Sequence, residues 1–84
     1  MVARPVRFTA HAVQMLTERG LDRDWVLRTL RAPDVVEADP LRPGRWRALA
    51  RLPERDGRWL RVVYEDETDG TVVVTAFLDR GRPA

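Results

Sequence analysis

The residues of this chain best suited to chemistry are one histidine and a large set of arginines. His11 is the only histidine. Imidazole is the side chain whose ordinary pKa lies near neutrality, which suits it to general acid or base work. The alternative is a structural histidine whose ring nitrogens bond to a neighbouring strand. All fifteen basic residues are arginine, and a planar guanidinium group suits contacts with phosphate.

The charge is unevenly distributed along the chain. Residues 43–63 carry six arginines against Glu54 and Asp56, a net +4, whereas residues 64–79 carry five acidic residues and no arginine. Arginine richness alone is a weak sign of nucleic-acid binding here. Lysine, asparagine and isoleucine are also absent, and a G+C-rich genome explains all three absences, so the local clustering carries more information than the composition.

Four of the arginines alternate along two predicted neighbouring strands, with a tryptophan between them: Arg45, Arg47, Arg51 and Arg61, with Trp59. Basic groups interleaved with an aromatic ring bind single-stranded RNA through phosphate contacts and base stacking. The alternative is a solvated arginine face with no ligand.

Two further side chains have both a structural and a functional interpretation. Arg19 comes just before Gly20, where it either contacts phosphate, bonds to the last carbonyls of its helix or pairs with a carboxylate. Tyr64 alternates with Leu60 and Val62, which predicts a core ring, with a hydroxyl that reaches a site as the alternative.

Several kinds of chemistry are excluded by composition. The chain has no cysteine and no serine, so disulfides and Cys or Ser nucleophiles are ruled out. A single histidine and carboxylates without the spacing of a metal loop predict no metal and no cofactor. Without an apolar run of about 20 residues or a signal-peptide pattern in residues 1–5, we expect no membrane association and a cytoplasmic location.

Two short helices are expected near the N-terminus, after a first strand at residues 6–8. Thr9 is a good N-cap for a helix of about ten residues that ends at Gly20. Asp22 caps a second helix, which should stop near Arg31 because the residue before Pro33 is pushed out of the helical region.

After these helices the pattern changes to strands. Apolar residues cluster or alternate over residues 35–36, 46–52, 58–64 and 71–78, separated by loops rich in Pro, Gly and Asp. With 84 residues the chain has room for one hydrophobic core. We therefore predict a single α+β domain over residues 1–84, with a short first strand, a two-helix hairpin and then a three- to four-stranded antiparallel sheet with the helices on one face.

The motifs resemble a known family. They are Phe8-Thr9-Ala10-His11-Ala12, Glu18-Arg19-Gly20-Leu21, Pro33-Asp34, Arg61-Val62-Val63-Tyr64-Glu65 and Val74-Thr75-Ala76. Together they resemble the domain-of-unknown-function family numbered 4258, which is similar in layout to the BrnT toxins and more distantly to RelE and ParE. The resemblance covers roughly residues 6–82, and it departs from the family at Met15, where a basic residue is common.

This resemblance implies a RelE/BrnT-like fold and a function. The function would be that of a toxin-like, metal-independent endoribonuclease of a type II toxin–antitoxin pair, which cleaves RNA by attack of a 2′-hydroxyl. The catalytic residues would then be His11 as base, Arg61 and Arg80 as phosphate stabilisers and Tyr64 as acid. RNA would be bound by Arg19, Arg45, Arg47, Arg51, Trp59 and Arg82, of which Arg82, like Arg80, lies just beyond the last strand, where toxins of this superfamily carry a basic residue.

The partners implied are a cognate antitoxin protein and RNA. The alternative function is a non-catalytic module that binds protein or nucleic acid on the same surface, including a ParE-like inhibitor of a DNA topoisomerase. In that case Trp46 and Trp59 would be the anchors, because Trp and Arg dominate interface hot spots.

Overall fold

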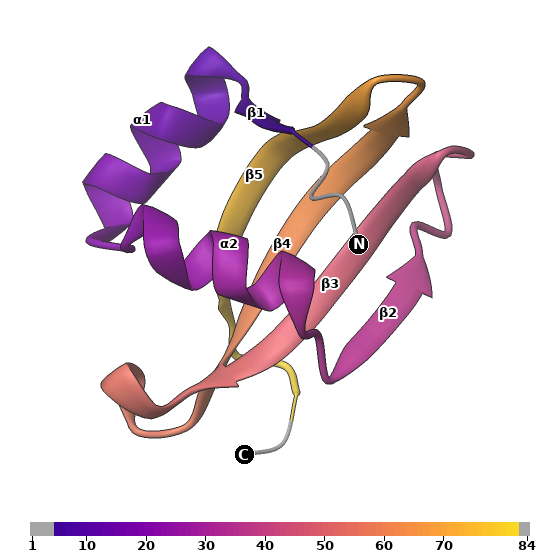
Figure 1. The fold of residues 1–84 in the computed structure, drawn as a ribbon. Helices are drawn as coiled ribbons and strands as arrows, with labels where there is room; N and C mark the ends of the chain where they lie inside the picture. Colours follow the sequence, from indigo (N-terminus) through magenta and orange to yellow (C-terminus); the bar gives the residue numbers. More distant parts are fainter. Residues whose placement is uncertain (1–4, 83–84) are drawn as a thin grey trace.

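Two helices cover one face of a five-stranded mixed sheet in the computed structural model, which describes residues 5–82 (Figure 1). The elements are β1 (Val6–Phe8), α1 (Ala10–Arg19), α2 (Arg23–Arg31), β2 (Val35–Ala38), β3 (Arg45–Leu52), the 3-10 turn η1 (Pro53–Arg55), β4 (Arg58–Glu67) and β5 (Gly70–Asp79). The predicted α+β class is confirmed. Residues 1–4, which make up most of the segment inspected for a signal peptide, and residues 83–84 lie outside the described part.

The helix boundaries follow the capping residues. The Thr9 side chain accepts a hydrogen bond from the Ala12 N–H at 3.0 Å, and Gly20 ends α1 with a φ of +63°, a conformation that glycine adopts without strain. Asp22 caps α2 by accepting from the Asp24 N–H at 2.8 Å. Both helices therefore lie where the sequence predicted them, and no helix within residues 5–82 is long and apolar enough to cross a membrane.

The strand order is β1-β5-β4-β3-β2, and β2 to β5 form an antiparallel meander. The sequence predicted three or four strands after the helices, and the structure has four. The sheet itself has five strands and is mixed, because β1 pairs parallel to β5. Thr71 donates to the Pro5 carbonyl at 2.9 Å and Thr9 to the Val73 carbonyl at 3.1 Å. This pairing joins segments about 65 residues apart, which local sequence patterns do not reveal.

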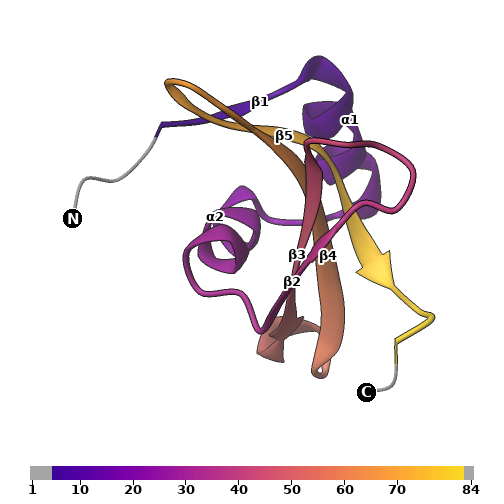
Figure 2. The same ribbon diagram turned by 90° about the vertical axis from the view of Figure 1, so that its right-hand side faces the viewer.

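The core lies between the helices and one face of the sheet. The buried residues of this core are Ala12, Leu16, Leu21, Val26, Leu52, Leu60, Val62, Val73 and Ala76. In an edge-on view α2 lies on one side of the sheet and the end of β5 turns to the other (Figure 2). The side of β3 and β4 that faces away from α2 carries Arg45, Arg47, Arg51 and Arg61, as the alternation predicted.

The arginine-bearing face is not a simple solvated surface. Leu49 points to this face yet is 0% exposed, and Val63 is 8% exposed. Leu49 lies between Arg47 and Arg51 along β3 and opposite Arg61 on β4. Arginine buries its aliphatic stem along apolar surface and keeps its charged end in water, and these side chains are placed to cover Leu49.

Candidate functional site

Four arginines line one cavity of about 360 Å³ at the end of the sheet that carries the turn between β3 and β4. Its lining residues are Arg19, Arg55, Arg58, Phe77, Leu78 and Arg80, and no carboxylate is among them. We call it the arginine cavity. The four guanidinium groups come from the end of α1, from η1, from the start of β4 and from the residue after β5.

Arg19 is fixed against the last strand. It is the final residue of α1, and its Nη1 donates to the Ala76 carbonyl of β5 at 2.7 Å. Its guanidinium carbon lies 5.7 Å from the centre of the Phe77 ring. The sequence suggested two structural contacts for Arg19, with the last carbonyls of its helix or with a carboxylate. The observed bond is to neither of these groups, because its acceptor is a strand carbonyl.

Arg55 bonds the end of α1 instead. Its Nη2 donates to the carbonyl oxygens of Arg19 and Gly20, both at 3.3 Å, and so serves acceptors that the helix leaves without a partner. The turn reaches this position because Asp56 and Gly57 adopt positive φ angles of 57° and 75°. Helix α1 and η1 are thereby held together beside the cavity.

The preceding residue ties the same turn to the second helix. Glu54 accepts two hydrogen bonds from Arg28, both at 2.8 Å. The bonds from Arg28 lower the pKa of Glu54 to about 2. The turn that supplies Arg55 is therefore attached to both helices.

Arg58 and Arg80 differ from these anchored arginines. Both are exposed, and neither has an ion pair or hydrogen bond from its side chain to any residue in the described range 5–82. Their charge is therefore uncompensated and available to a ligand. The lining side chains offer many donors and include no imidazole, carboxyl or hydroxyl group, so the cavity is suited to hold an anion rather than to transfer a proton.

The other predicted arginines face carboxylates. The ion pairs on the arginine-bearing face are Arg45 with Glu65 at 3.0 Å, Arg47 with Glu37 at 3.6 Å, Arg82 with Glu37 at 3.0 Å, and Arg61 with Asp79. Burial raises the pKa of Asp79, but hydrogen bonds from Arg61 and the Gly81 N–H outweigh this, and the pKa lies below its usual value. Much of the positive charge on this face is thus neutralised within the chain.

Two aromatic rings are each flanked by two guanidinium groups. Arg51 and Arg82 lie 4.9 and 5.6 Å from the Trp59 ring, and Arg61 joins Arg19 over Phe77 at 5.3 Å. The predicted interleaving of basic and aromatic groups therefore exists in the fold, and Phe77 connects it to the arginine cavity.

His11 and Tyr64 lie away from this cavity. His11 is exposed in the first turn of α1, and the eight residues to Arg19 correspond to about 12 Å along the helix. Tyr64 points to the opposite face of β4 from Arg61 because side chains alternate along a strand. Burial, followed by the charge of Asp66, raises the pKa of Tyr64.

The structure thus brings together two of the predicted site residues, Arg19 and Arg80, with two that were not singled out, Arg55 and Arg58. Both missed residues belong to the basic segment 43–63, whose net +4 was the available signal. No group of three or more potential metal ligands occurs among residues 5–82.

Comparison with known proteins identifies the family of this chain but does not identify an activity. A family model, Domain of unknown function (DUF4258), matches residues 8–78. The chain therefore belongs to this family. No curated protein and no solved structure matches it significantly.

Proposed function

We propose that this domain binds RNA and that the arginine cavity holds a phosphate group of the RNA backbone. The observation that carries the proposal is the convergence of four guanidinium groups with no carboxylate lining the cavity. Arginine binds phosphate through short, charge-assisted hydrogen bonds. The sequence motifs imply a similarity in layout to BrnT and RelE toxins, and for this reason we propose RNA as the polyanion that the cavity binds.

The surroundings of the cavity favour a single strand. Phe77 lines the cavity and Trp59 lies on the same face of the sheet, each between two guanidinium groups. Unstacked bases of single-stranded RNA stack on aromatic rings and on guanidinium planes. A duplex keeps its bases stacked and gains less from such a surface.

The test is binding of a labelled single-stranded RNA oligonucleotide, measured by fluorescence anisotropy. Arg58→Gln and Arg80→Gln each remove one unpaired guanidinium and should weaken binding by about tenfold, with a larger loss in the double variant. Arg31→Gln and Arg42→Gln are matched controls, because both arginines are exposed and unpaired within residues 5–82 but lie outside the cavity. Equal affinities in the double variant and the controls would overturn the proposal.

A second candidate is the toxin-like, metal-independent endoribonuclease. Positive charge around a bound phosphate stabilises the phosphorane formed by 2′-hydroxyl attack, and the cavity supplies that charge. The proton-transfer groups would come from elsewhere: His11 is about 12 Å along α1 from Arg19. Cleavage of RNA in the presence of EDTA, with cyclic phosphate ends and loss of activity in Arg80→Gln, would support this candidate.

The same cavity gives the expected antitoxin a place to bind. A partner that places acidic side chains over Arg58 and Arg80 would neutralise the two uncompensated charges and exclude RNA. Expression in a bacterial host distinguishes the remaining alternatives. Growth arrest with fragmented RNA supports the ribonuclease, arrest with intact RNA supports a ParE-like topoisomerase inhibitor, and normal growth supports a benign binding module.

A further inference from the structure

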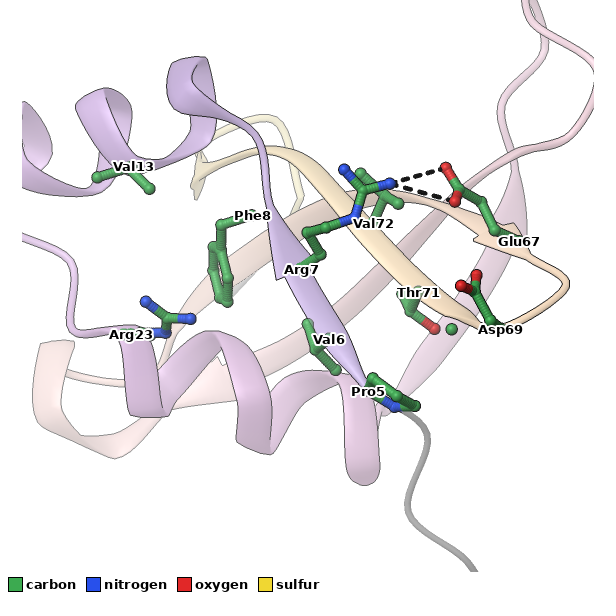
Figure 3. A pocket seen from close by; sticks show the side chains of 11 residues that line it. Pro5, Val6, Arg7, Phe8, Val13, Arg23, Glu67, Asp69, Thr71 and Val72 are labelled. Carbon is green, nitrogen blue, oxygen red and sulfur yellow. Dashed lines mark hydrogen bonds and ion pairs between the residues drawn. The ribbon is translucent and has the colours of Figure 1, made fainter.

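The surface has hollows other than the arginine cavity, and they differ in how their polar groups are arranged. The hollow beside β1, of about 560 Å³, is lined by apolar residues and by charges that do not converge. Arg7 and Glu67 pair with each other at 3.2 Å, and Arg23 and Asp69 lie on opposite sides of β1 (Figure 3). The described residues of this hollow therefore present no common set of groups to a single ligand.

A hollow of about 320 Å³ adjoins the arginine cavity. Its lining residues are Arg61, Asp79, Gly81 and Arg82, and we call it the Asp79 hollow. Arg80 lines the arginine cavity, whereas its two neighbours in the chain line this hollow. The two sites are therefore adjacent, and one RNA strand can occupy both.

Two of the lining residues hold hydrogen-bond donors that have no acceptor. The Nε–H groups of Arg61 and Arg82 are buried and have no partner among residues 5–82. The Nη2 groups of the same arginines bond to Asp79 and Glu37. A buried donor without an acceptor costs free energy. A ligand that accepts hydrogen bonds from these two guanidinium groups recovers that cost.

Asp79 supplies acceptors to the same hollow. One of its carboxylate oxygens accepts from the Gly81 N–H at 2.9 Å, and the other accepts from Arg61. A carboxylate has about four lone-pair sites, so about two remain for a ligand. The side chains of Arg61 and Asp79 are only 21% and 9% exposed, and a hydrogen bond made there is stronger than one made in water.

The charges around the hollow favour a neutral ligand. Arg61 and Asp79 neutralise each other, and Arg82 pairs with Glu37 at 3.0 Å. A phosphate in the hollow would face the Asp79 carboxylate, and like charges repel more strongly where water is scarce. The hollow is therefore suited to a neutral group that carries acceptors for the arginines and donors for the carboxylate.

We propose that the Asp79 hollow binds a guanine base of the RNA strand. Among the four RNA bases, guanine alone presents two adjacent donors, N1–H and the 2-amino group, and both bond to the Asp79 carboxylate. Its O6 lies beside N1–H, as Arg61 lies beside Asp79, and O6 and N7 accept from the arginines in the commonest specific contact of arginine with a base. This inference rests on the proposed RNA binding and names the base that is selected.

The test compares single-stranded RNA oligonucleotides that differ at one base. A labelled oligouridine of about nine nucleotides, and versions of it with a central guanosine, adenosine or cytidine, are titrated with the protein and followed by fluorescence anisotropy. The guanosine version should bind at least about tenfold more tightly than the others. Inosine, which lacks only the 2-amino group, and 7-deazaguanosine, which lacks only the N7 acceptor, should each lose most of this preference.

Asp79→Asn removes the carboxylate and should bind all four oligonucleotides with equal affinity. Its affinity for oligouridine should not fall, because a negative charge is removed. Urea unfolding checks that the variant is folded. Asp69→Asn is the matched control, because Asp69 is exposed and lines neither site, and it should keep the preference for guanosine.

Three results would overturn the proposal while RNA binding itself stands. They are equal affinity of the wild type for the guanosine and adenosine versions, equal affinity for guanosine and inosine, and an undiminished preference in folded Asp79→Asn. The inosine comparison needs no variant, so it decides the question even where Asp79→Asn does not fold. If the wild type binds none of the oligonucleotides, the proposed RNA binding fails as well, and the two failures are thereby distinguished.

Discussion

Arg28 and Glu54 lie 26 residues apart in the chain and meet in a two-point ion pair, with both nitrogen to oxygen distances at 2.8 Å. The pair joins α2 to the turn between β3 and β4. Arg55 follows directly in the sequence, and it bonds the carbonyl oxygens at the end of α1. One ion pair therefore helps to hold a wall of the arginine cavity in place.

The first prediction concerns pH. The hydrogen bonds from Arg28 lower the pKa of Glu54 from 4.5 to about 2, so the folded state binds a proton at Glu54 less readily than the unfolded chain. This contribution to stability is present above pH 4.5 and is lost as the pH falls to about 2. Glu54→Gln should therefore be less stable than the wild type at pH 7, and the difference should vanish near pH 2.

Urea unfolding followed by tryptophan fluorescence at several pH values measures this difference. Arg28→Gln should show the same dependence, because it removes the other partner. Arg31→Gln, at the end of the same helix and without an ion pair in the described part of the chain, is the control. A pH-independent difference in Glu54→Gln would show that the ion pair is not the cause.

The second prediction concerns salt. Each phosphate neutralised on a single strand contributes about 0.7 to the slope of log K against log salt concentration. The double variant Arg58→Gln, Arg80→Gln should reduce this slope by about 0.7, because both guanidinium groups are uncompensated and line the cavity that holds one phosphate. Anisotropy titrations at several salt concentrations give the slope, and an unchanged slope would place the phosphate contacts elsewhere.

The sequence predicted best those features that local chemistry decides. Thr9 and Asp22 cap their helices, and Pro33 ends the second, because each acts on its immediate neighbours. The parallel pairing of β1 with β5 escaped prediction. It depends on where the chain returns after both helices and the meander, and a three-residue strand carries too little pattern to identify its partner.

Only part of the site was predicted, because the rest of it depends on contacts between segments that are distant in the sequence. Arg19 and Arg80 were singled out by their positions at the ends of elements, yet Arg55 and Arg58 enter the cavity only because the turn folds back onto α1. The pairing of Arg61 with Asp79 requires the register of β4 and β5. Alternation identified the face of the sheet but not which charges on it remain unpaired.

The third prediction concerns the packing of β1. A Cβ atom at Gly70 would lie 2.6 Å from the Pro5 carbonyl oxygen, which accepts the hydrogen bond from Thr71. Gly70→Ala should destabilise the fold by about 1–3 kcal/mol and expose the Thr71 amide to hydrogen exchange. Gly81→Ala is the control, because its Cβ would meet nothing nearer than Asp79 Oδ1 at 3.5 Å. Wild-type stability and exchange in Gly70→Ala would contradict the close approach of β1.

The last prediction separates RNA binding from cleavage through His11. The side chain is exposed and lies at the opposite end of α1 from Arg19, so His11→Gln should change stability by less than about 0.5 kcal/mol and leave RNA affinity unchanged. A fall in affinity to the level of the Arg58 variant would show that RNA contacts both ends of α1. Cleavage by the wild type that disappears in His11→Gln, with binding intact, would identify the imidazole as the base. Cleavage that persists would exclude it, because RNA bound at the arginine cavity would then react without the imidazole.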